Sequence, residues 1–240
     1  MTCILSLSSN DAYINLQLYF SYSFLKLYSE VLGFFNILDQ KRGGTIVERL
    51  KNKVIEDGVV IDEKILKVDG FLNHQIDAEL MHEIGQVFYD QFSKENVTKV
   101  LTIEASGIAP AIMAALHFDV PCLFAKKAKP STLNKGFYHT DVHSFTKNKT
   151  STVIISEEFL ASDDRILIID DFLANGEAAL GLHRLVQQAN ATTVGVGILV
   201  EKSFQQGRAR LEEAGLNVAS LCQIASLEGN KVTLVGEENA

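Results

Sequence analysis

The chain has 240 residues, of which 47% are hydrophobic and 22% charged, and its formal net charge is −8. This length suits one α/β domain with an appendage. The acidic balance argues against a nucleic-acid-binding surface, which needs clustered Lys and Arg. The cysteines at positions 3, 122 and 222 have no paired spacing, so they indicate neither a disulfide framework nor a zinc site. They fit a reducing cytoplasm.

Residues 1–46 differ from the rest in composition, with 8 of the 20 aromatic residues but only 6 of the 52 charged ones. Within them, residues 12–38 are apolar enough to raise the question of a membrane helix. Polar and charged residues interrupt this run, including Lys26 and Glu30. Since a mid-helix charge costs roughly 3 kcal/mol on insertion scales, no membrane span is expected. A basic region and a small-residue cleavage site are both missing, so no signal peptide is expected either.

A further hypothesis is that residues 1–46 are a mis-annotated upstream translation. The tripeptide Arg42-Gly43-Gly44 could be encoded by a purine-rich, ribosome-binding-like run, and Val47 by a GTG start codon. We therefore expect an extension over 1–46 and a domain over 47–240.

From residue 47 onward, the pattern predicts alternating helices and strands. A short charged helix over 47–57 ends at Gly58, and short strands follow over 59–61 and 65–68. Asp77 suits the N-cap of the next helix. The apolar residues of that helix recur at helical spacing: Leu80, Met81, Ile84, Val87, Phe88 and Phe92. Later strands are expected over 100–103, 121–124, 166–169 and 194–200, helices over 108–116 and 177–188, a loop over 126–134, and a hairpin pairing 145–146 with 151–155.

This alternation predicts an α/β fold with a mostly parallel twisted sheet flanked by helices. In such sheets, ligands bind outside the carboxyl ends of the strands. The most informative end follows strand 166–169, where Asp170 and Asp171 lead into a small-residue loop and the helix from Glu177. Loop N–H groups and the helix dipole can hold a phosphate, while the carboxylates accept hydrogen bonds from sugar hydroxyls. Local pattern alone also fits an ordinary strand-to-helix connection with solvated acids.

The amino-acid sequence of this segment resembles the motif that binds phosphoribosyl pyrophosphate (PRPP) in type I phosphoribosyltransferases. In that family, a hydrophobic strand leads into Asp-Asp and a loop for the 5′-phosphate. The commonest pattern has Thr-Gly-x-Thr where this chain has Asn175-Gly176-Glu177-Ala178, so two hydroxyl donors are missing and backbone N–H groups would carry more of the binding. This form is similar to the one in the xanthine-specific branch, and the resemblance extends from Val47 to the C-terminus.

The resemblance assigns PRPP-binding roles to three segments. The loop residues Ala174, Asn175, Gly176, Glu177 and Ala178 would hold the 5′-phosphate. The small-residue turn Glu104, Ala105, Ser106 and Gly107 would hold pyrophosphate, although a tight strand–helix turn explains it equally well locally. The cluster Lys126, Lys127 and Lys129 would supply cations from a mobile loop, although such a run is usually a solvated face.

The same resemblance points to four residues around the base. Lys202, in Glu201-Lys202-Ser203-Phe204, would donate to a purine carbonyl, and Phe204 would lie against the ring. Leu66 and Asn73 belong to a segment that forms a small hood over the base, about residues 47–76 together with C-terminal segments. On local grounds alone, Lys202 is typical of a surface Lys, Phe204 of a core Phe and Asn73 of a turn residue.

Another pair, His139 and His143, brackets Asp141 at a spacing that binds metal on a helix. Gly136 and nearby β-branched residues make a helix doubtful there, and no third ligand is evident, so we expect no metal site.

The resemblance implies transfer of 5-phosphoribosyl from PRPP to xanthine in purine salvage, with catalytic Asp170 and Asp171. It also implies Mg²⁺ carried by PRPP rather than by a protein metal site, a cytoplasmic homodimer, and no nucleic-acid or membrane partner. Two alternatives stay open. One is the same reaction on guanine or hypoxanthine. The other is a PRPP-sensing transcription regulator, for which residues 1–46 are a poor DNA-binding candidate because they are nearly devoid of basic charge.

Overall fold

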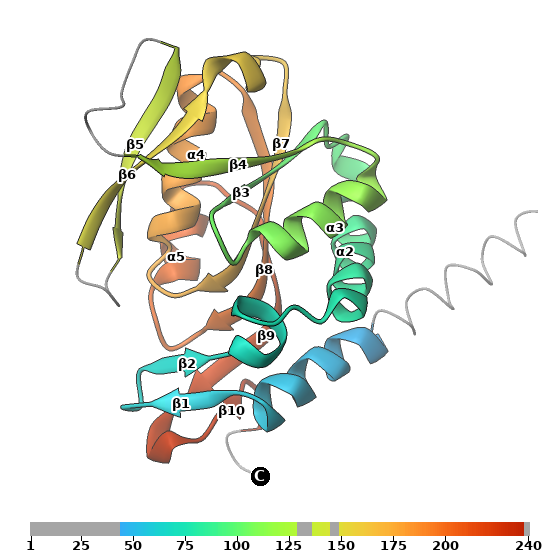
Figure 1. Cartoon of the computed structure of the whole chain (residues 1–240), viewed down its shortest axis with the longest axis vertical. Coiled ribbons are helices and arrows are strands. Elements are labelled where there is room, and N and C mark those ends of the chain that lie inside the picture. The colour runs from blue at the N-terminus through green and yellow to red at the C-terminus, as the bar shows by residue number, and fades with distance from the viewer. Residues whose placement is uncertain (1–43, 129–135, 145–148, 238–240) are drawn as a thin grey trace, which may run out of the picture. The chain divides into compact units, whose positions relative to one another are not determined.

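A computed structural model describes residues 44–128, 136–144 and 149–237, and from Ile46 onward these belong to one compact unit, Ile46–Ala240. Its described strands form an eight-stranded sheet in the order β10-β9-β8-β7-β3-β4-β6-β5 (Figure 1). The five central strands β9, β8, β7, β3 and β4 are parallel, and β10, β6 and β5 add antiparallel edges. The predicted α/β fold with a mostly parallel sheet is confirmed. The strands are β3 (Lys99–Ile103), β4 (Cys122–Ala128), β5 (Phe137–Ser144), β6 (Lys149–Ser156), β7 (Arg165–Leu173), β8 (Thr192–Lys202), β9 (Val218–Ser226) and β10 (Thr233–Leu234).

Helices cover both faces of this sheet. Helices α2 (Ala78–Phe92) and α3 (Ile108–Phe118) lie on one face, and α4 (Glu177–Gln188) and α5 (Gly207–Glu213) lie on the other (Figure 1). A hydrophobic core lies on each face of the sheet, and strand β7 contributes to both. Leu167 and Ile169 pack with α2 and α3, while Ile166 and Ile168 pack with α4. This confirms that the apolar run 166–169 is buried on both faces. Short helical turns complete the connections: Ser93–Glu95, Glu157–Phe159 and Glu228–Asn230.

The segment before the sheet forms a small subdomain. Residues 44–56 are helical, and strands β1 (Val59–Ile61) and β2 (Ile65–Lys67) pair as an antiparallel hairpin. A π-helical turn, η1 (Asp69–Asn73), then leads to α2. The predicted helix and both short strands are confirmed to within a few residues.

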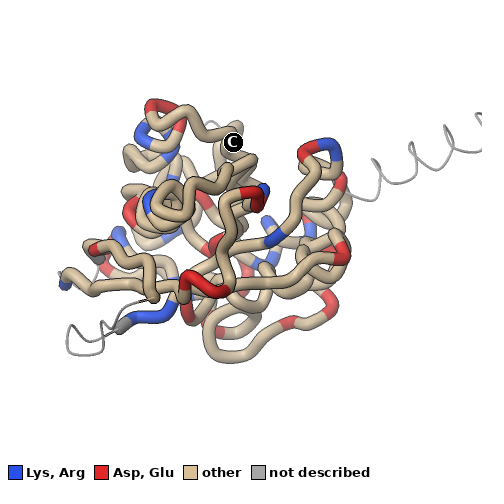
Figure 2. The backbone as a smooth tube through the Cα atoms, turned by 90° about the horizontal axis from the view of Figure 1, so that it is seen from above, with Lys and Arg blue, Asp and Glu red and all other residues tan. Residues whose placement is uncertain are grey.

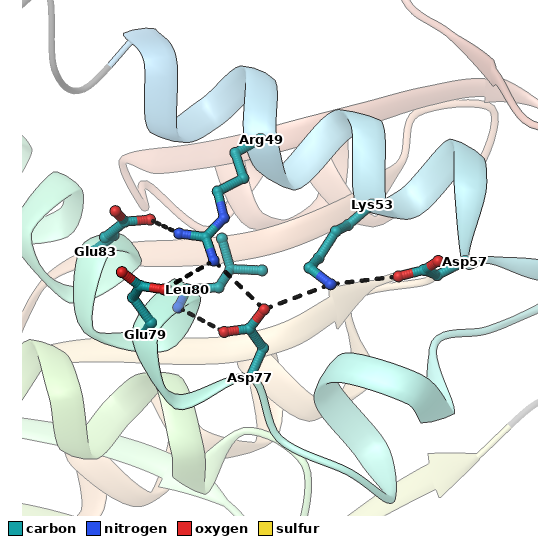
Figure 3. A network of polar contacts seen from close by, with 7 residues as sticks. All are labelled: Arg49, Lys53, Asp57, Asp77, Glu79, Leu80 and Glu83. Carbon is teal, nitrogen blue, oxygen red and sulfur yellow. Dashed lines mark hydrogen bonds and ion pairs between the residues drawn. The ribbon is translucent and has the colours of Figure 1, made fainter.

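Polar contacts fix the helix over 44–56 against the start of α2 (Figure 3). Asp77 caps α2 by accepting from the Leu80 N–H at 3.0 Å, as predicted. This backbone hydrogen bond is the largest of the effects that hold the pKa of Asp77 below its ordinary value, and Arg49 and Lys53 add to it. Arg49 also bonds Glu83 at 2.6 Å. The network therefore joins two elements that are separated by the β1–β2 hairpin.

Two predictions for the region after α3 need correction. Lys126 and Lys127 were expected in a loop, but both lie in β4, because this strand continues by pairing with β6 as far as Ala128. A hairpin does form, but it pairs all of β5 with β6, starting at Phe137. The expected strand over 145–146 and Lys129 lie outside the described residues. Strands β9 and β10 and helix α5 were not predicted.

Other expectations concern charge and composition. Acidic and basic positions are interspersed along the described backbone, as Figure 2 shows in the view from above. In the described ranges, no helix is both long enough and apolar enough to cross a membrane, and no cluster of three or more His, Cys, Asp or Glu side chains could hold a metal ion. Residues 12–38 lie outside those ranges. His139 and His143 lie on β5 rather than on a helix.

Candidate active site

The acidic pair lies inside a strand rather than after it. The sequence predicted that the strand ends at Ile169, but β7 continues to Leu173 because β8 is long enough to pair with it, with Asp170 opposite Ile198 and Leu173 opposite Glu201. On the other side of β7, the neighbouring strand β3 ends at Ile103. The side chains are not solvated: the exposed fractions of Asp170 and Asp171 are only 4% and 9%.

This burial perturbs the pair electrostatically. Burial raises the pKa of Asp170 well above its ordinary value, and the negative charge of Asp171 raises it further. The Asp171 N–H donates to Asp170 Oδ1 at 3.1 Å, and the charge of Lys127 acts in the opposite direction. Perturbed carboxyl groups of this kind are typical of functional sites, because such a site is built to receive a polar or charged ligand.

The loop after β7 is shaped for an anion. Gly176 precedes α4 with φ of 80°, a left-handed conformation that glycine adopts readily, and α4 begins at Glu177 as predicted. The first N–H groups of a helix have no partner within it. Helix α5 fixes this loop, because the N–H of its first residue, Gly207, donates to the Ala174 carbonyl oxygen at 3.0 Å. Backbone donors can therefore bind a phosphate without the missing threonines.

A second turn, Glu104–Gly107, follows β3 and faces the acidic pair. Lys127 holds it twice: its N–H donates to Glu104 Oε1 at 2.7 Å, and its Nζ donates to the Glu104 carbonyl oxygen at 2.8 Å. A Cβ atom built on Gly107 would lie 2.2 Å from Thr102 Oγ1 and 2.9 Å from Asp170 Oδ1. Only glycine lets the backbone come this close to Asp170. Lys126 instead has its Nζ 5.6 Å from the centre of the Phe124 ring.

Lys202, the last residue of β8, also lines the site. Its Nζ donates to the Lys64 carbonyl oxygen at 2.7 Å and lies 6.0 Å from the centre of the Phe172 ring. Burial lowers the pKa of Lys202. Phe172 thus lies beside the ammonium group, whereas Phe204 is 46% exposed.

These elements surround one cavity of about 520 Å³. It brings together most of the residues predicted for the site: Glu104, Ser106, Lys127, Asp170, Asp171, Ala174, Asn175, Gly176, Glu177, Ala178 and Lys202. Six predicted residues are not in its wall: Leu66, Asn73, Ala105, Gly107, Lys126 and Phe204. The Leu66 side chain is buried in the core, and Asn73 ends η1 with an exposed side chain.

Sequence reasoning missed nine residues of the wall: Lys64, Ile65, Ile103, Val142, His143, Phe172, Leu173, Ala179 and Gln205. Six of them directly adjoin predicted positions, so extending each motif by one residue would have found them: Ile65, Ile103, Phe172, Leu173, Ala179 and Gln205. The other three, Lys64, Val142 and His143, come from the β1–β2 hairpin and from β5. Only the long-range pairing of strands brings these segments to the cavity.

The cavity wall combines four carboxylates, Glu104, Asp170, Asp171 and Glu177, with three ammonium groups, Lys64, Lys127 and Lys202. Its wall therefore includes an anion-binding loop, carboxylates that can accept from hydroxyl groups, and a lysine beside an aromatic ring. The arrangement suits a ligand that carries a phosphate, a sugar and a flat polar ring.

Comparison with known proteins agrees with this geometry. The family described as "Phosphoribosyl transferase domain" matches residues 71–215. The xanthine phosphoribosyltransferase of Staphylococcus epidermidis is 76% identical over 191 residues, which cover 80% of this chain and 100% of that protein. The Staphylococcus aureus protein of the same name is 76% identical over 192 residues, with the same coverage.

Solved structures of adenine phosphoribosyltransferases share the fold. The enzyme from Rhodothermus marinus has a TM-score of 0.61 at 26% identity, covering 75% of this chain and 99% of that one. The enzyme from Saccharomyces cerevisiae also has a TM-score of 0.61, at 16% identity, covering 74% of this chain and 99% of that one. The chain therefore belongs to the phosphoribosyltransferase family, in the group of the xanthine phosphoribosyltransferases whose full length it matches.

Proposed function

We propose that this protein transfers the 5-phosphoribosyl group from PRPP to xanthine, giving xanthosine 5′-monophosphate (XMP) and pyrophosphate in purine salvage. The observation that carries the proposal is a single cavity whose wall includes Asp170, Asp171, the phosphate-type loop 174–178 and Lys202. The names of the relatives at 76% identity support the choice of base.

In this proposal, each part of the cavity binds one part of the substrates. The loop 174–178 binds the 5′-phosphate through backbone N–H groups. Asp170 and Asp171 accept hydrogen bonds from the ribose hydroxyls, directly or through Mg²⁺ or water. The turn 104–107 receives the pyrophosphate, and Lys127 fixes that turn and places a positive charge beside it.

The reaction is a substitution at the anomeric carbon. A purine nitrogen forms the new bond to this carbon and loses its proton, while the bond from the carbon to a pyrophosphate oxygen breaks. The electron pair of the broken bond leaves with pyrophosphate, which can take up the proton. Positive charge develops on the sugar in the transition state, where buried carboxylates stabilise it. Positioning and electrostatics suffice for such a step, so no covalent nucleophile is required.

Mg²⁺ fits this cavity as a cation that enters with the substrate. Asp170 and Asp171 offer the hard oxygen ligands that Mg²⁺ prefers, and this ion commonly uses one or two carboxylates together with substrate phosphates. When bound, it supplies charge neutralisation for the leaving pyrophosphate.

Base selection belongs to the other end of the cavity. The Lys202 ammonium group donates to a purine carbonyl, in place of or together with the Lys64 carbonyl oxygen that it now contacts. Phe172 offers a ring face beside it. Leu66, Asn73 and Phe204 join the base site only if the hood moves on binding, since none of the three is in the cavity wall. Guanine and hypoxanthine are the rival substrates, and few hydrogen bonds separate them from xanthine.

Asp171→Asn tests the sugar end of the site. We expect this variant to lose turnover by at least about 100-fold while keeping its melting temperature, because it removes a charge that stabilises the transition state. Asp163→Asn, on an exposed position outside the cavity, is the matched control. Near-normal XMP formation by Asp171→Asn would defeat the assignment.

The proposal extends to the native product and its assembly. We propose a cytoplasmic homodimer whose native chain starts at Val47. Relatives that match over their full length cover 191 or 192 residues, which is 80% of this chain and leaves room for an unmatched extension. Intact-mass measurement on protein from its native source tests the start, and a mass that includes Met1 would contradict it. Light scattering at known concentration tests the dimer.

A further inference from the structure

Helix α5 contacts the phosphate-type loop through a second residue besides Gly207. Arg210 Nη1 donates to the Asn175 carbonyl oxygen and forms an ion pair with Glu177 Oε1 at 2.7 Å. The exposed fractions of the Arg210 and Glu177 side chains are 36% and 20%. One guanidinium group thus binds two oxygen atoms from the segment proposed to hold the 5′-phosphate.

Both of these oxygen atoms are unfavourable neighbours for a phosphate. Glu177 is the first residue of α4 and lines the cavity, so its carboxylate belongs to the same segment whose N–H groups a phosphate would use. Like charges at close range repel, and the repulsion is stronger where protein excludes water. The cavity already holds three other carboxylates, Glu104, Asp170 and Asp171. A cation that neutralises Glu177 would therefore favour binding of a polyanion.

We propose that Arg210 is a positioning residue of the phosphate site. It neutralises Glu177 and holds the Asn175 carbonyl oxygen, so that the loop presents N–H groups without an uncompensated negative charge. The inference rests on the proposed function, because it takes the 5′-phosphate to bind at 174–178. This loop lacks both threonines of the commonest pattern, and the contacts of Arg210 fix its conformation in another way.

A purely structural role makes a different prediction. If Arg210 only ties α5 to α4, its loss should loosen the loop whether or not Glu177 is charged. If Arg210 acts by compensating Glu177, removing the Glu177 charge as well should restore binding. The pair of variants therefore separates the two roles by a double-mutant cycle.

The experiment measures binding of ribose 5-phosphate and of PRPP with Mg²⁺ by calorimetry to wild type, Arg210→Met, Glu177→Gln and the double variant. Ribose 5-phosphate carries the 5′-phosphate but no pyrophosphate, so it reports on the loop alone. We expect Arg210→Met to weaken both ligands about tenfold, which corresponds to about 1.4 kcal/mol. In turnover, KM for PRPP should rise by a similar factor while kcat stays within about twofold, as expected for lost uniform binding.

The double variant should recover affinity to within about threefold of wild type, and Glu177→Gln alone should bind at least as well as wild type. Arg210→Lys keeps the charge and should lie within about threefold of wild type even if Arg210→Met fails to fold. Arg165→Met is the matched control. Arg165 likewise bonds a carbonyl oxygen and a carboxylate, both of Glu95, but at the opposite end of β7. Its loss should leave ligand binding unchanged.

Wild-type affinity in Arg210→Met would overturn the inference, and so would equal weakness of the single and double variants. A tenfold weakening in Arg210→Lys would also overturn it. If the wild-type protein binds neither ribose 5-phosphate nor PRPP, the proposed function fails together with this inference.

Discussion

Replacing Gly107 by Ala should disable the site with little damage to the fold. The added Cβ would lie 2.2 Å from Thr102 Oγ1, whereas ordinary contact begins at 3.4 Å, so the turn or its neighbours must shift by about 1.2 Å. Overpacking of this size costs roughly 1–3 kcal/mol, which corresponds to a fall in melting temperature of about 2–12 °C at this chain length. Because the Cβ also lies 2.9 Å from Asp170 Oδ1, the shift misplaces either the turn 104–107, proposed to receive pyrophosphate, or Asp170, proposed to be catalytic. A displacement near 1 Å can cost about 100-fold in rate.

The assay compares kcat/KM for XMP formation with the melting temperature of the same preparation. Gly70→Ala is the control, because a Cβ atom there has no neighbour within 4 Å and no positive φ. Normal activity in Gly107→Ala would refute the close approach of the turn to Asp170. Complete unfolding would refute the estimate that the strain stays local.

Two further variants test separate parts of the site, and a third tests a buried ion pair outside the cavity wall. Asp170→Asn should abolish turnover but raise the melting temperature near neutral pH. Burial raises the pKa of Asp170 above its ordinary value of 3.8, so the folded wild-type protein loses stability as the pH rises from 3.8 through the raised pKa. The melting temperature of the variant, measured across the same pH range, should not show this decrease. Arg208→Met should cost roughly 3 kcal/mol in denaturant unfolding, because Glu201 is 3% exposed and its partner at 2.6 Å is removed. Arg208 helps to hold the pKa of Glu201 below 4.5, so the ion pair between them stabilises the wild-type fold above pH 4.5. Acidification below pH 4.5 should therefore destabilise the variant less than the wild type. Lys202→Met should raise KM for xanthine at least about tenfold, with PRPP affinity unchanged by calorimetry.

The main elements of the fold could be predicted because their patterns are local. The apolar run 166–169, the N-cap at Asp77 and the helix Glu177–Gln188 each carry their own signal, and the structure has all three. The bounds that failed depend on partners distant in sequence. Strand β7 continues through Asp170 and Asp171 because β8 pairs with them, and β4 continues through Lys127 because β6 does.

The site was predictable to the extent that its motifs are continuous in sequence. The loop 174–178 and the acidic pair line one cavity, as their order along the chain suggested. The neighbours that tune them could not be predicted. The Lys202 ammonium group donates to the carbonyl oxygen of Lys64, which lies 138 residues away in sequence, and Arg210 donates to that of Asn175, which lies 35 residues away. These contacts depend on how the hairpin β1–β2 and helix α5 pack, which no local pattern encodes.

The most direct test of the central proposal is a turnover assay with PRPP, Mg²⁺ and each of xanthine, guanine, hypoxanthine and adenine. We predict XMP and pyrophosphate in equal amounts from xanthine, at the highest kcat/KM of the four bases. A higher kcat/KM with guanine or hypoxanthine would contradict the assignment of the base, and no product from any base would contradict the enzyme itself.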